Sequence, residues 1–93
     1  MTLRMEKELL QKIEPLARLL LTPAQIGDLL GLSGEDVAEM QNPYREAGKM
    51  YRRVLAERAR DLHEKTLRLA DVGSPTAIDE ANQWLRTAQI SIE

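Results

Sequence analysis

The feature that most constrains the fold is a twenty-residue stretch from Pro23 to Asn42, which carries the boundary signals of two short helices. Thr22 can cap the first helix, because its hydroxyl can accept a backbone N–H that has no helical partner, and proline suits the first helical position. Gly31 ends this helix. Ser33 can cap the second helix, with Asp36 three residues later in the position of a capping box. Together these signals predict a helix-turn-helix.

A helix-turn-helix restricts only a few positions, and this stretch satisfies each of them. The first helix needs a small residue where the second crosses it, and Gly27 provides one. The tight turn needs a residue that tolerates a positive φ, which is Gly31. Five apolar residues are placed to fill the wedge between the two helices: Ile26, Leu30, Leu32, Val37 and Met40.

Upstream of this motif, apolar residues at helical spacing are interrupted by Pro15. Proline lacks a backbone donor and crowds the preceding helical turn. We therefore expect one helix to end near Glu14 and a second to begin with Pro15 in its first turn. The alternative is a single kinked helix.

Downstream, the pattern predicts one long helix from about Pro43 to Val72, and a final helix that begins at Ser74-Pro75 and frays from about Gln89. Gly73 suits the position that follows a helix C-terminus. Gly48 lies inside the long helix, where glycine costs about 1 kcal/mol relative to alanine. Close packing against the helix-turn-helix or a neighbouring subunit would explain it.

The predicted fold class is all-α. A single domain over residues 1–93 has a helix-turn-helix region at 15–42, followed by a helical hairpin at 43–90 made of the long helix and the short terminal helix. Leu55, Leu62 and Leu69 repeat every seven residues, so this seam packs either inside the molecule or against a second copy. Trp84 lies on the final helix with little else to cover it. We expect these four residues to take part in a homo-oligomer interface.

Composition argues against several classes of function. The chain has no cysteine, and therefore no disulfide or thiolate zinc site. His63 is its only histidine, and no catalytic or phosphate-loop motif is present, so we expect no enzyme, metal or cofactor. The charged first residues do not fit a secretory signal, and the longest apolar run, Leu19–Leu21, is too short to span a bilayer. We expect a cytoplasmic protein without membrane contact.

Charge is distributed unevenly along the chain. Residues 44–70 carry eight basic and four acidic side chains, whereas residues 1–43 carry four basic and seven acidic ones. The second helix of the motif, residues 34–41, has three acids and no base, which disfavours approach to phosphates. Ser33, Gln41 and Asn42 are the residues around it that can hydrogen-bond to DNA bases or phosphates.

The basic block supplies the positive charge that this helix lacks. Four of its residues lie close together: Arg45, Lys49, Arg52 and Arg53. Unlike most of the other basic residues of the block, the three arginines have no acidic residue three or four positions upstream to pair with. This basic cluster, flanked by Tyr44 and Tyr51, is the best candidate for binding the phosphates of double-stranded DNA. The alternative is a solvated helix face whose tyrosines pack inward.

Three parts follow one another in a recognisable order: the helix-turn-helix from Leu21 to Ser33, the long charged helix, and the turn Gly73-Ser74-Pro75-Thr76-Ala77 before an amphipathic helix. This order resembles the small terminase subunit of tailed bacteriophages and related prophage proteins, over roughly Leu21 to Leu85. The resemblance implies a non-enzymatic DNA-recognition protein that forms oligomers. It also implies that the protein marks viral DNA for packaging and recruits the large ATPase-nuclease subunit.

Two other functions stay open at this point. A small helix-turn-helix transcriptional regulator would use the same motif as a dimer. A structural or adaptor protein would use the motif only for packing and would not bind DNA. The acidic second helix favours the adaptor, whereas the basic cluster favours DNA.

Overall fold

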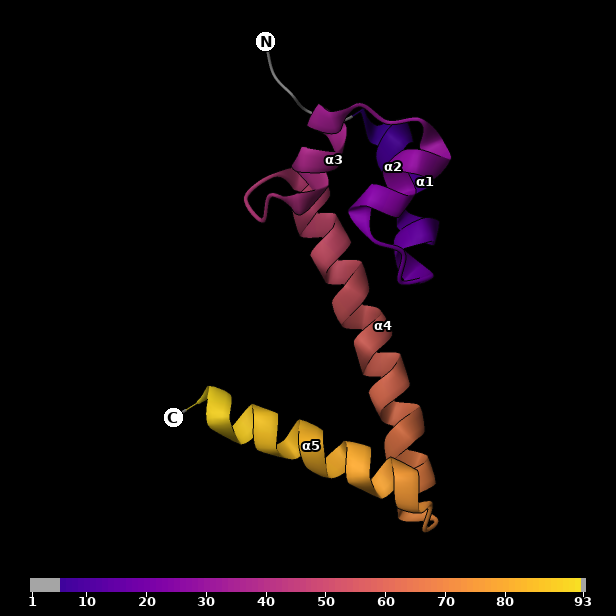
Figure 1. The fold of residues 1–93 in the computed structure, drawn as a ribbon, viewed down its shortest axis with the longest axis vertical. Helices are drawn as coiled ribbons and strands as arrows, with labels where there is room; N and C mark the ends of the chain where they lie inside the picture. Colours follow the sequence, from indigo (N-terminus) through magenta and orange to yellow (C-terminus); the bar gives the residue numbers. More distant parts are fainter. Residues whose placement is uncertain (1–5, 93) are drawn as a thin grey trace. The chain divides into compact units, whose positions relative to one another are not determined.

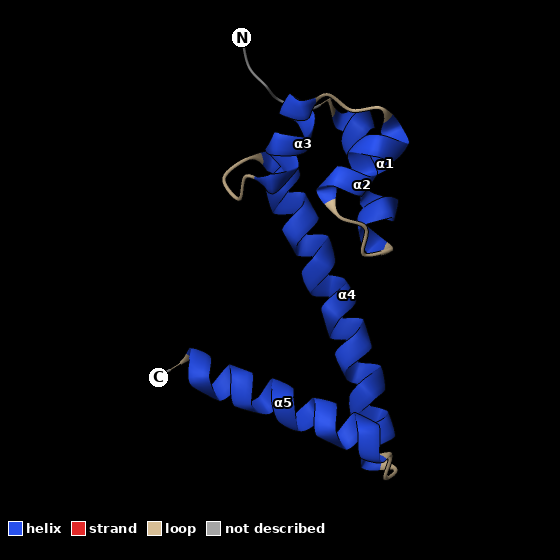
Figure 2. Cartoon of the chain, viewed as in Figure 1, coloured by secondary structure: helices blue, strands red, loops and turns tan. Residues whose placement is uncertain are grey.

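Helical spacing and cap residues produce five α-helices within residues 6–92, the part of the chain that this computed structural model describes. The helices in chain order are α1 (Lys7–Arg18), α2 (Pro23–Leu30), α3 (Gly34–Gln41), α4 (Glu46–Asp71) and α5 (Pro75–Ser91) (Figure 1). The described residues contain no strand, as Figure 2 shows, so the predicted all-α class is confirmed.

The chain divides within α4 into two compact units, Met1–Arg58 and Ala59–Glu93. The first unit holds the helix-turn-helix together with α1 and the N-terminal part of α4. The second holds the rest of α4 and α5. The single domain expected from the chain length stays a prediction, which a truncation after Arg58 would test.

Helix α1 runs through Pro15 without a break, so the expected boundary at Glu14 is wrong and the single-helix alternative holds. Ile13 and Ala17 lie four residues apart on one helix face, and both are completely buried. Pro15 itself faces solvent. Burial on both sides of the proline offsets the hydrogen bond that it removes.

The helix-turn-helix has the caps that its sequence predicts. The backbone N–H of Gln25 donates to the Thr22 hydroxyl, and the Gln25 side chain accepts from the Thr22 N–H, which forms a capping box that was not predicted. The backbone N–H of Asp36 donates to the Ser33 hydroxyl at 3.2 Å. Gly31 has φ 66°, the left-handed conformation expected of it.

Close contact between α2 and α3 explains Gly27. A Cβ added there would lie 2.6 Å from Cγ2 of Val37, so a larger residue would force the Val37 side chain or the helices to shift. The predicted wedge is also confirmed. Ile26 and Met40 are buried, and the other three apolar side chains pack against the core around them.

Helix α4 begins at Glu46, three residues later than expected. Asn42 precedes a proline, which disfavours helical ψ, and it has ψ 114°. Its side-chain oxygen accepts the N–H of Tyr44 at 2.9 Å, and its carbonyl accepts the N–H of Arg45 at 3.2 Å. These hydrogen bonds form a defined turn between α3 and α4 in place of the first helical residues.

Gly48 allows α4 to cross the end of α3. A Cβ there would lie 2.6 Å from the carbonyl carbon of Asn42 and 3.2 Å from the carbonyl oxygen of Glu39. The expected close packing against the helix-turn-helix is therefore confirmed. Tyr51, one turn further along α4, donates its hydroxyl to the carbonyl of Leu21 at 2.7 Å.

The first unit has a hydrophobic core to which α1 to α4 all contribute. Its buried members are Ile13, Ala17, Ile26, Met40, Ala47, Met50 and Val54. By contrast, Ala77 is the only buried residue within residues 59–92. The second unit is held instead by the turn at Gly73, which has φ 96°, and by a stack of the His63 and Trp84 rings with centroids 3.6 Å apart.

Candidate nucleic-acid interface

Helix α3, the second helix of the motif, exposes less negative charge than its sequence indicates. The side chain of Glu39 is only 7% exposed, and an oxygen of its carboxylate lies 3.5 Å from Nε of Arg45. Glu35 is exposed and Asp36 is half-buried. Two acids, rather than three, therefore face outward from α3, and both lie in its first turn.

The three polar candidates around α3 differ in what they have left to offer a ligand. Gln41 is exposed, and the structure gives its side chain no hydrogen bond within residues 6–92. The Ser33 hydroxyl accepts a bond at the start of α3 but retains its own proton as a donor. The Asn42 amide oxygen is used in the turn before α4, so its NH₂ group remains.

Two of the four basic residues have acidic partners on other helices. Arg45 lies beside Glu39 of α3, and Arg53 lies 3.7 Å from Glu14 of α1 and 4.0 Å from Glu57. None of these acids lies three or four positions upstream on α4, so the rule applied to the sequence could not find them. Lys49 and Arg52 have no ion pair within the described residues.

Arg53 belongs to a ring of four charges that joins α1 to α4. Arg18 donates to Glu57 at 2.9 Å and to Glu14 at 3.4 Å, and Arg53 lies near the same two carboxylates. The hydrogen bond to Glu57 is the largest of the effects that raise the pKa of Arg18. Because its charge is shared between two acids, Arg53 is the weakest of the four candidates for binding phosphate.

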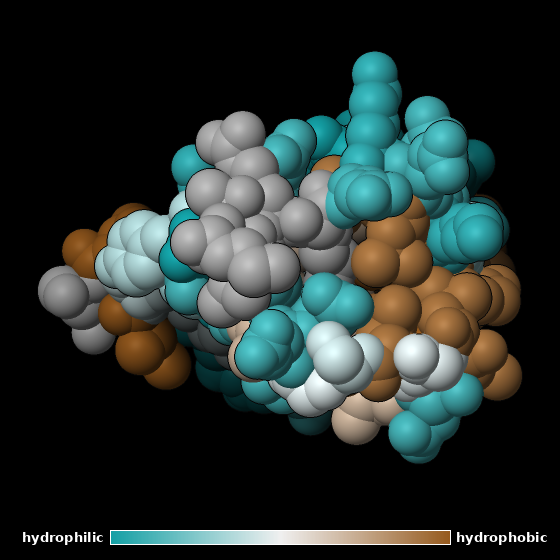
Figure 3. Space-filling view, turned by 90° about the horizontal axis from the view of Figure 1, so that it is seen from above, coloured by the Kyte–Doolittle hydropathy of each residue, from teal (hydrophilic) through white to brown (hydrophobic). Residues whose placement is uncertain are grey.

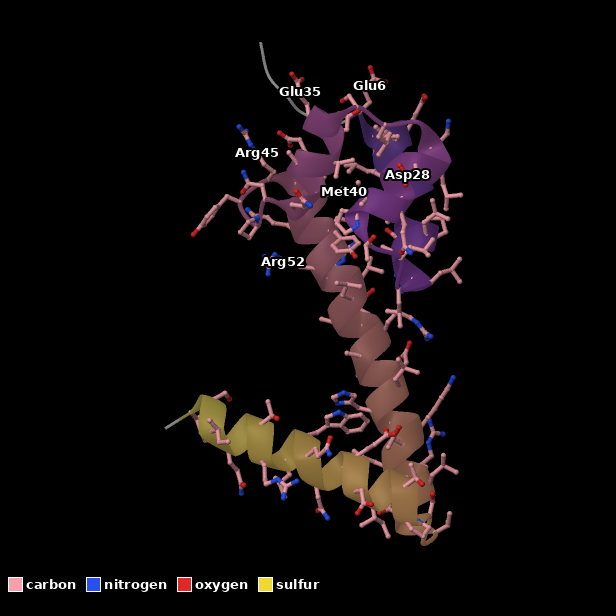
Figure 4. The ribbon with its side chains drawn as sticks, viewed as in Figure 1. Glu6, Asp28, Glu35, Met40, Arg45 and Arg52 are labelled. Atoms are coloured by element: carbon pink, nitrogen blue, oxygen red, sulfur yellow. The ribbon has the colours of Figure 1, made fainter. Side chains whose placement is uncertain are left out.

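Two hollows bring the remaining candidates together. Gln41 and Arg52 line a hollow of about 280 Å³ whose other walls are Pro23, Met40, Tyr51 and Leu55. Arg45 and Lys49 line another of about 420 Å³. Figure 4 shows Arg45 and Arg52 projecting from the same side of the unit, away from Asp28 on α2. The surface at the α3 end and the first turns of α4 thus carries amide and basic groups together with the acids Glu39 and Glu46, and neither hollow includes Ser33 or Asn42.

The two tyrosines that flank the basic cluster differ in exposure. Tyr51 is half-buried, its hydroxyl is bonded to Leu21, and burial raises its pKa. Tyr44 is 85% exposed on the turn before α4. One tyrosine therefore packs inward, as the solvated-face alternative expected, and the other stands beside the basic side chains.

This unit also has a second kind of surface, which is apolar. Figure 3 shows apolar surface gathered over α1 and α2. The large apolar residues exposed in this part of the chain include Leu19 and Leu20, which follow α1, and Leu29 on α2. Leu20 also has φ 65°, which is rare for a bulky residue. Apolar surface of this kind suits contact with protein rather than with DNA.

The candidates for oligomerisation are exposed to different degrees. Leu55 is half-buried, whereas 39% of Leu62 and 55% of Leu69 are exposed, so these last two do not belong to an internal core. Trp84 is half-buried beneath His63, which corrects the expectation that it has little cover.

Residues 6–92 contain neither of two further classes of site. No group of three or more metal-ligating side chains there could hold a metal ion. None of the helices in that range combines the length and the apolar character needed to cross a membrane. In comparisons with known proteins, no family model matches the chain, and no curated protein or solved structure matches it either.

Proposed function

We propose that this chain is a non-enzymatic, DNA-binding helix-turn-helix protein of the small-terminase type. The observation that carries the proposal is the helix-turn-helix itself. Gly27 allows α2 and α3 to touch at Val37, and the left-handed Gly31 sets the tight turn between them. Motifs of this geometry present their second helix to the major groove of DNA.

The charges around α3 support this proposal and indicate where DNA would lie. Glu39 is neutralised by Arg45, and the remaining acids are confined to the first turn of α3. Gln41, at the other end of the helix, shares a hollow with Arg52, which has no ion pair within the described residues. Contact would therefore centre on the C-terminal end of α3 and the first turns of α4, with Lys49 and Arg52 on phosphates.

The oligomeric part of the proposal rests on the second unit. Only Ala77 is buried within residues 59–92, whereas large apolar side chains such as Leu69, Leu85 and Ile90 are more than half exposed. A unit of this size rarely maintains its fold without a disulfide, a metal or a further chain. A second copy of the chain could cover these side chains. The resulting homo-oligomer would be the form that marks viral DNA and recruits a large subunit.

Fluorescence anisotropy with labelled duplex DNA at several salt concentrations tests the proposal. Lys49→Ala combined with Arg52→Ala should weaken binding to all sequences and reduce the salt slope by about two, because each of the two side chains neutralises one phosphate. Arg86→Ala, which removes an exposed base on α5, is the matched control and should leave the slope unchanged. Absence of duplex binding at low salt by the intact oligomer would contradict the proposal.

A second function, that of a protein adaptor, is favoured by the exposed Leu19, Leu20 and Leu29. In that case Leu29→Ser would abolish capture of a partner protein, while the double basic variant would have no effect. Loss of DNA binding in the double basic variant would therefore support the DNA-binding function, and loss of partner capture in Leu29→Ser would support the adaptor.

A further inference from the structure

Tyr44 stands out among the aromatic side chains of the chain. It is 85% exposed, whereas Tyr51 and Trp84 are both half-buried and in contact with other groups. Exposing a whole phenol ring gains nothing for folding, because the ring would be more favourably placed against apolar surface. The ring is therefore accessible to a ligand.

The backbone that carries this ring is held in place. The N–H of Tyr44 donates to the side-chain oxygen of Asn42 at 2.9 Å, and the next N–H, of Arg45, donates to the Asn42 carbonyl at 3.2 Å. A ring on such a turn loses little backbone freedom when it binds a ligand. Preorganisation of this kind increases affinity.

The neighbours of Tyr44 provide polar contacts but no net charge. Tyr44 lines the hollow of about 420 Å³ together with two basic and two acidic residues: Arg45, Lys49, Glu39 and Glu46. Because these charges balance, the hollow adds little long-range attraction for a polyanion, and a bound strand would depend on local contacts. The ring and Lys49, which has no ion pair in the described part of the chain, are the groups in this hollow that can provide such contacts.

We propose that Tyr44 is a stacking platform for an unpaired nucleobase, so that the surface beside α3 also binds single-stranded DNA. Bases in a duplex are stacked on one another and present only their edges, whereas an unpaired base has a free face that stacks on aromatic rings. Lys49, which has no ion pair within residues 6–92, can contact the adjacent phosphate. The inference rests on the proposed DNA-binding function and adds a substrate class to it.

The test compares the full-length chain with Tyr44→Leu and Tyr44→Phe in anisotropy titrations of a labelled oligothymidine and of a labelled duplex. Stacking on one base contributes about 1–3 kcal/mol, so Tyr44→Leu should weaken oligothymidine binding by about 5- to 150-fold. Tyr44→Phe retains the ring and should bind within about twofold of the wild type. Duplex affinity, and the salt slope for both DNAs, should be the same in all three proteins.

The variants distinguish the possible failures. Equal losses for Tyr44→Phe and Tyr44→Leu would assign the contact to the hydroxyl and a phosphate, which overturns stacking. Wild-type affinity of Tyr44→Leu for oligothymidine would overturn the inference while the proposed function stands on duplex binding. If neither DNA binds at low salt, the proposed function and the inference both fail. Circular dichroism of each variant verifies that it is folded. We expect no change in the fold, because a side chain this exposed contributes little to stability.

Discussion

At the scale of single residues, Gly48 gives the clearest prediction, because helix propensity and packing disagree about it. Propensity alone makes Gly48→Ala stabilising by about 1 kcal/mol. The added Cβ would, however, meet the backbone carbonyl of Asn42, which cannot rotate away as a side chain can. We expect the variant to lose about 2 kcal/mol or more of its free energy of unfolding, as measured by urea denaturation.

Gly34→Ala is the matched control for this prediction. Gly34 is the first residue of α3, and a Cβ built there has no heavy atom within 4 Å. Its substitution should leave stability unchanged or raise it slightly. A Gly48→Ala protein that is more stable than the wild type would show that α3 and α4 do not cross as closely as described.

The partly buried hydrogen bond of Tyr51 leads to a second prediction. Tyr51→Phe removes the bond from its hydroxyl to the carbonyl of Leu21 and should cost about 0.5–1.5 kcal/mol, whereas Tyr44→Phe should cost nothing. Burial raises the pKa of Tyr51 above its ordinary value of 10.0, so the folded chain holds this proton more tightly. This contribution is complete below about pH 10 and is lost as the pH rises through the folded value. Chemical denaturation of the wild type, Tyr51→Phe and Tyr44→Phe at pH 7 and at about pH 11 measures the hydrogen bond and its pH dependence. A loss of stability in Tyr44→Phe equal to that in Tyr51→Phe would contradict this assignment.

At the scale of elements, helix ends were predictable where a local residue determines them. Thr22, Gly31 and Ser74 cap or end helices through bonds to backbone a few residues away, and the structure has those ends. The boundary predicted at Pro15 is wrong, because the burial of its neighbours in a core formed by distant helices outweighs its local effect. The start of α4 was misplaced, because the turn at Asn42 satisfies the backbone groups that a longer helix would have used.

The pair of Glu39 and Arg45 connects the end of α3 to the turn before α4, and it gives a third prediction. Arg45→Ala would leave a nearly buried carboxylate without its basic partner, which should cost about 1–2 kcal/mol of unfolding free energy. Lys49→Ala removes a similar charge that has no such partner and should stay within about 0.5 kcal/mol of the wild type. Chemical denaturation measures both. If adding Glu39→Gln to Arg45→Ala restores stability, the loss arises from the unpaired carboxylate. Equal effects of Arg45→Ala and Lys49→Ala on stability would mean that the Glu39–Arg45 pair contributes nothing.

At the scale of the whole molecule, the sequence predicted which residues could form the site but not how charge is distributed over it. The basic block and the acidic α3 were visible in the sequence, because they are properties of contiguous residues. The burial of Glu39, and the ring that joins Arg53 to Glu14 on α1, link residues that are distant along the chain. Such pairings depend on tertiary packing, and no spacing rule within one helix detects them.

The unequal burial of the two units gives the last prediction, which concerns what each needs in order to fold. The buried residues of the hydrophobic core all lie between Ile13 and Val54, inside the unit Met1–Arg58. A chain truncated after Arg58 should therefore unfold cooperatively. Its unfolding temperature should not depend on protein concentration. The full chain should unfold at a higher temperature as its concentration rises, because the proposed association of copies through Leu62 and Leu69 would stabilise the folded state by mass action. Leu62→Ser with Leu69→Ser should remove this dependence and give a monomeric mass by light scattering. An unfolded truncated chain would favour the single domain expected from the length, and a monomeric wild type at high concentration would mean that the exposed leucines do not join copies.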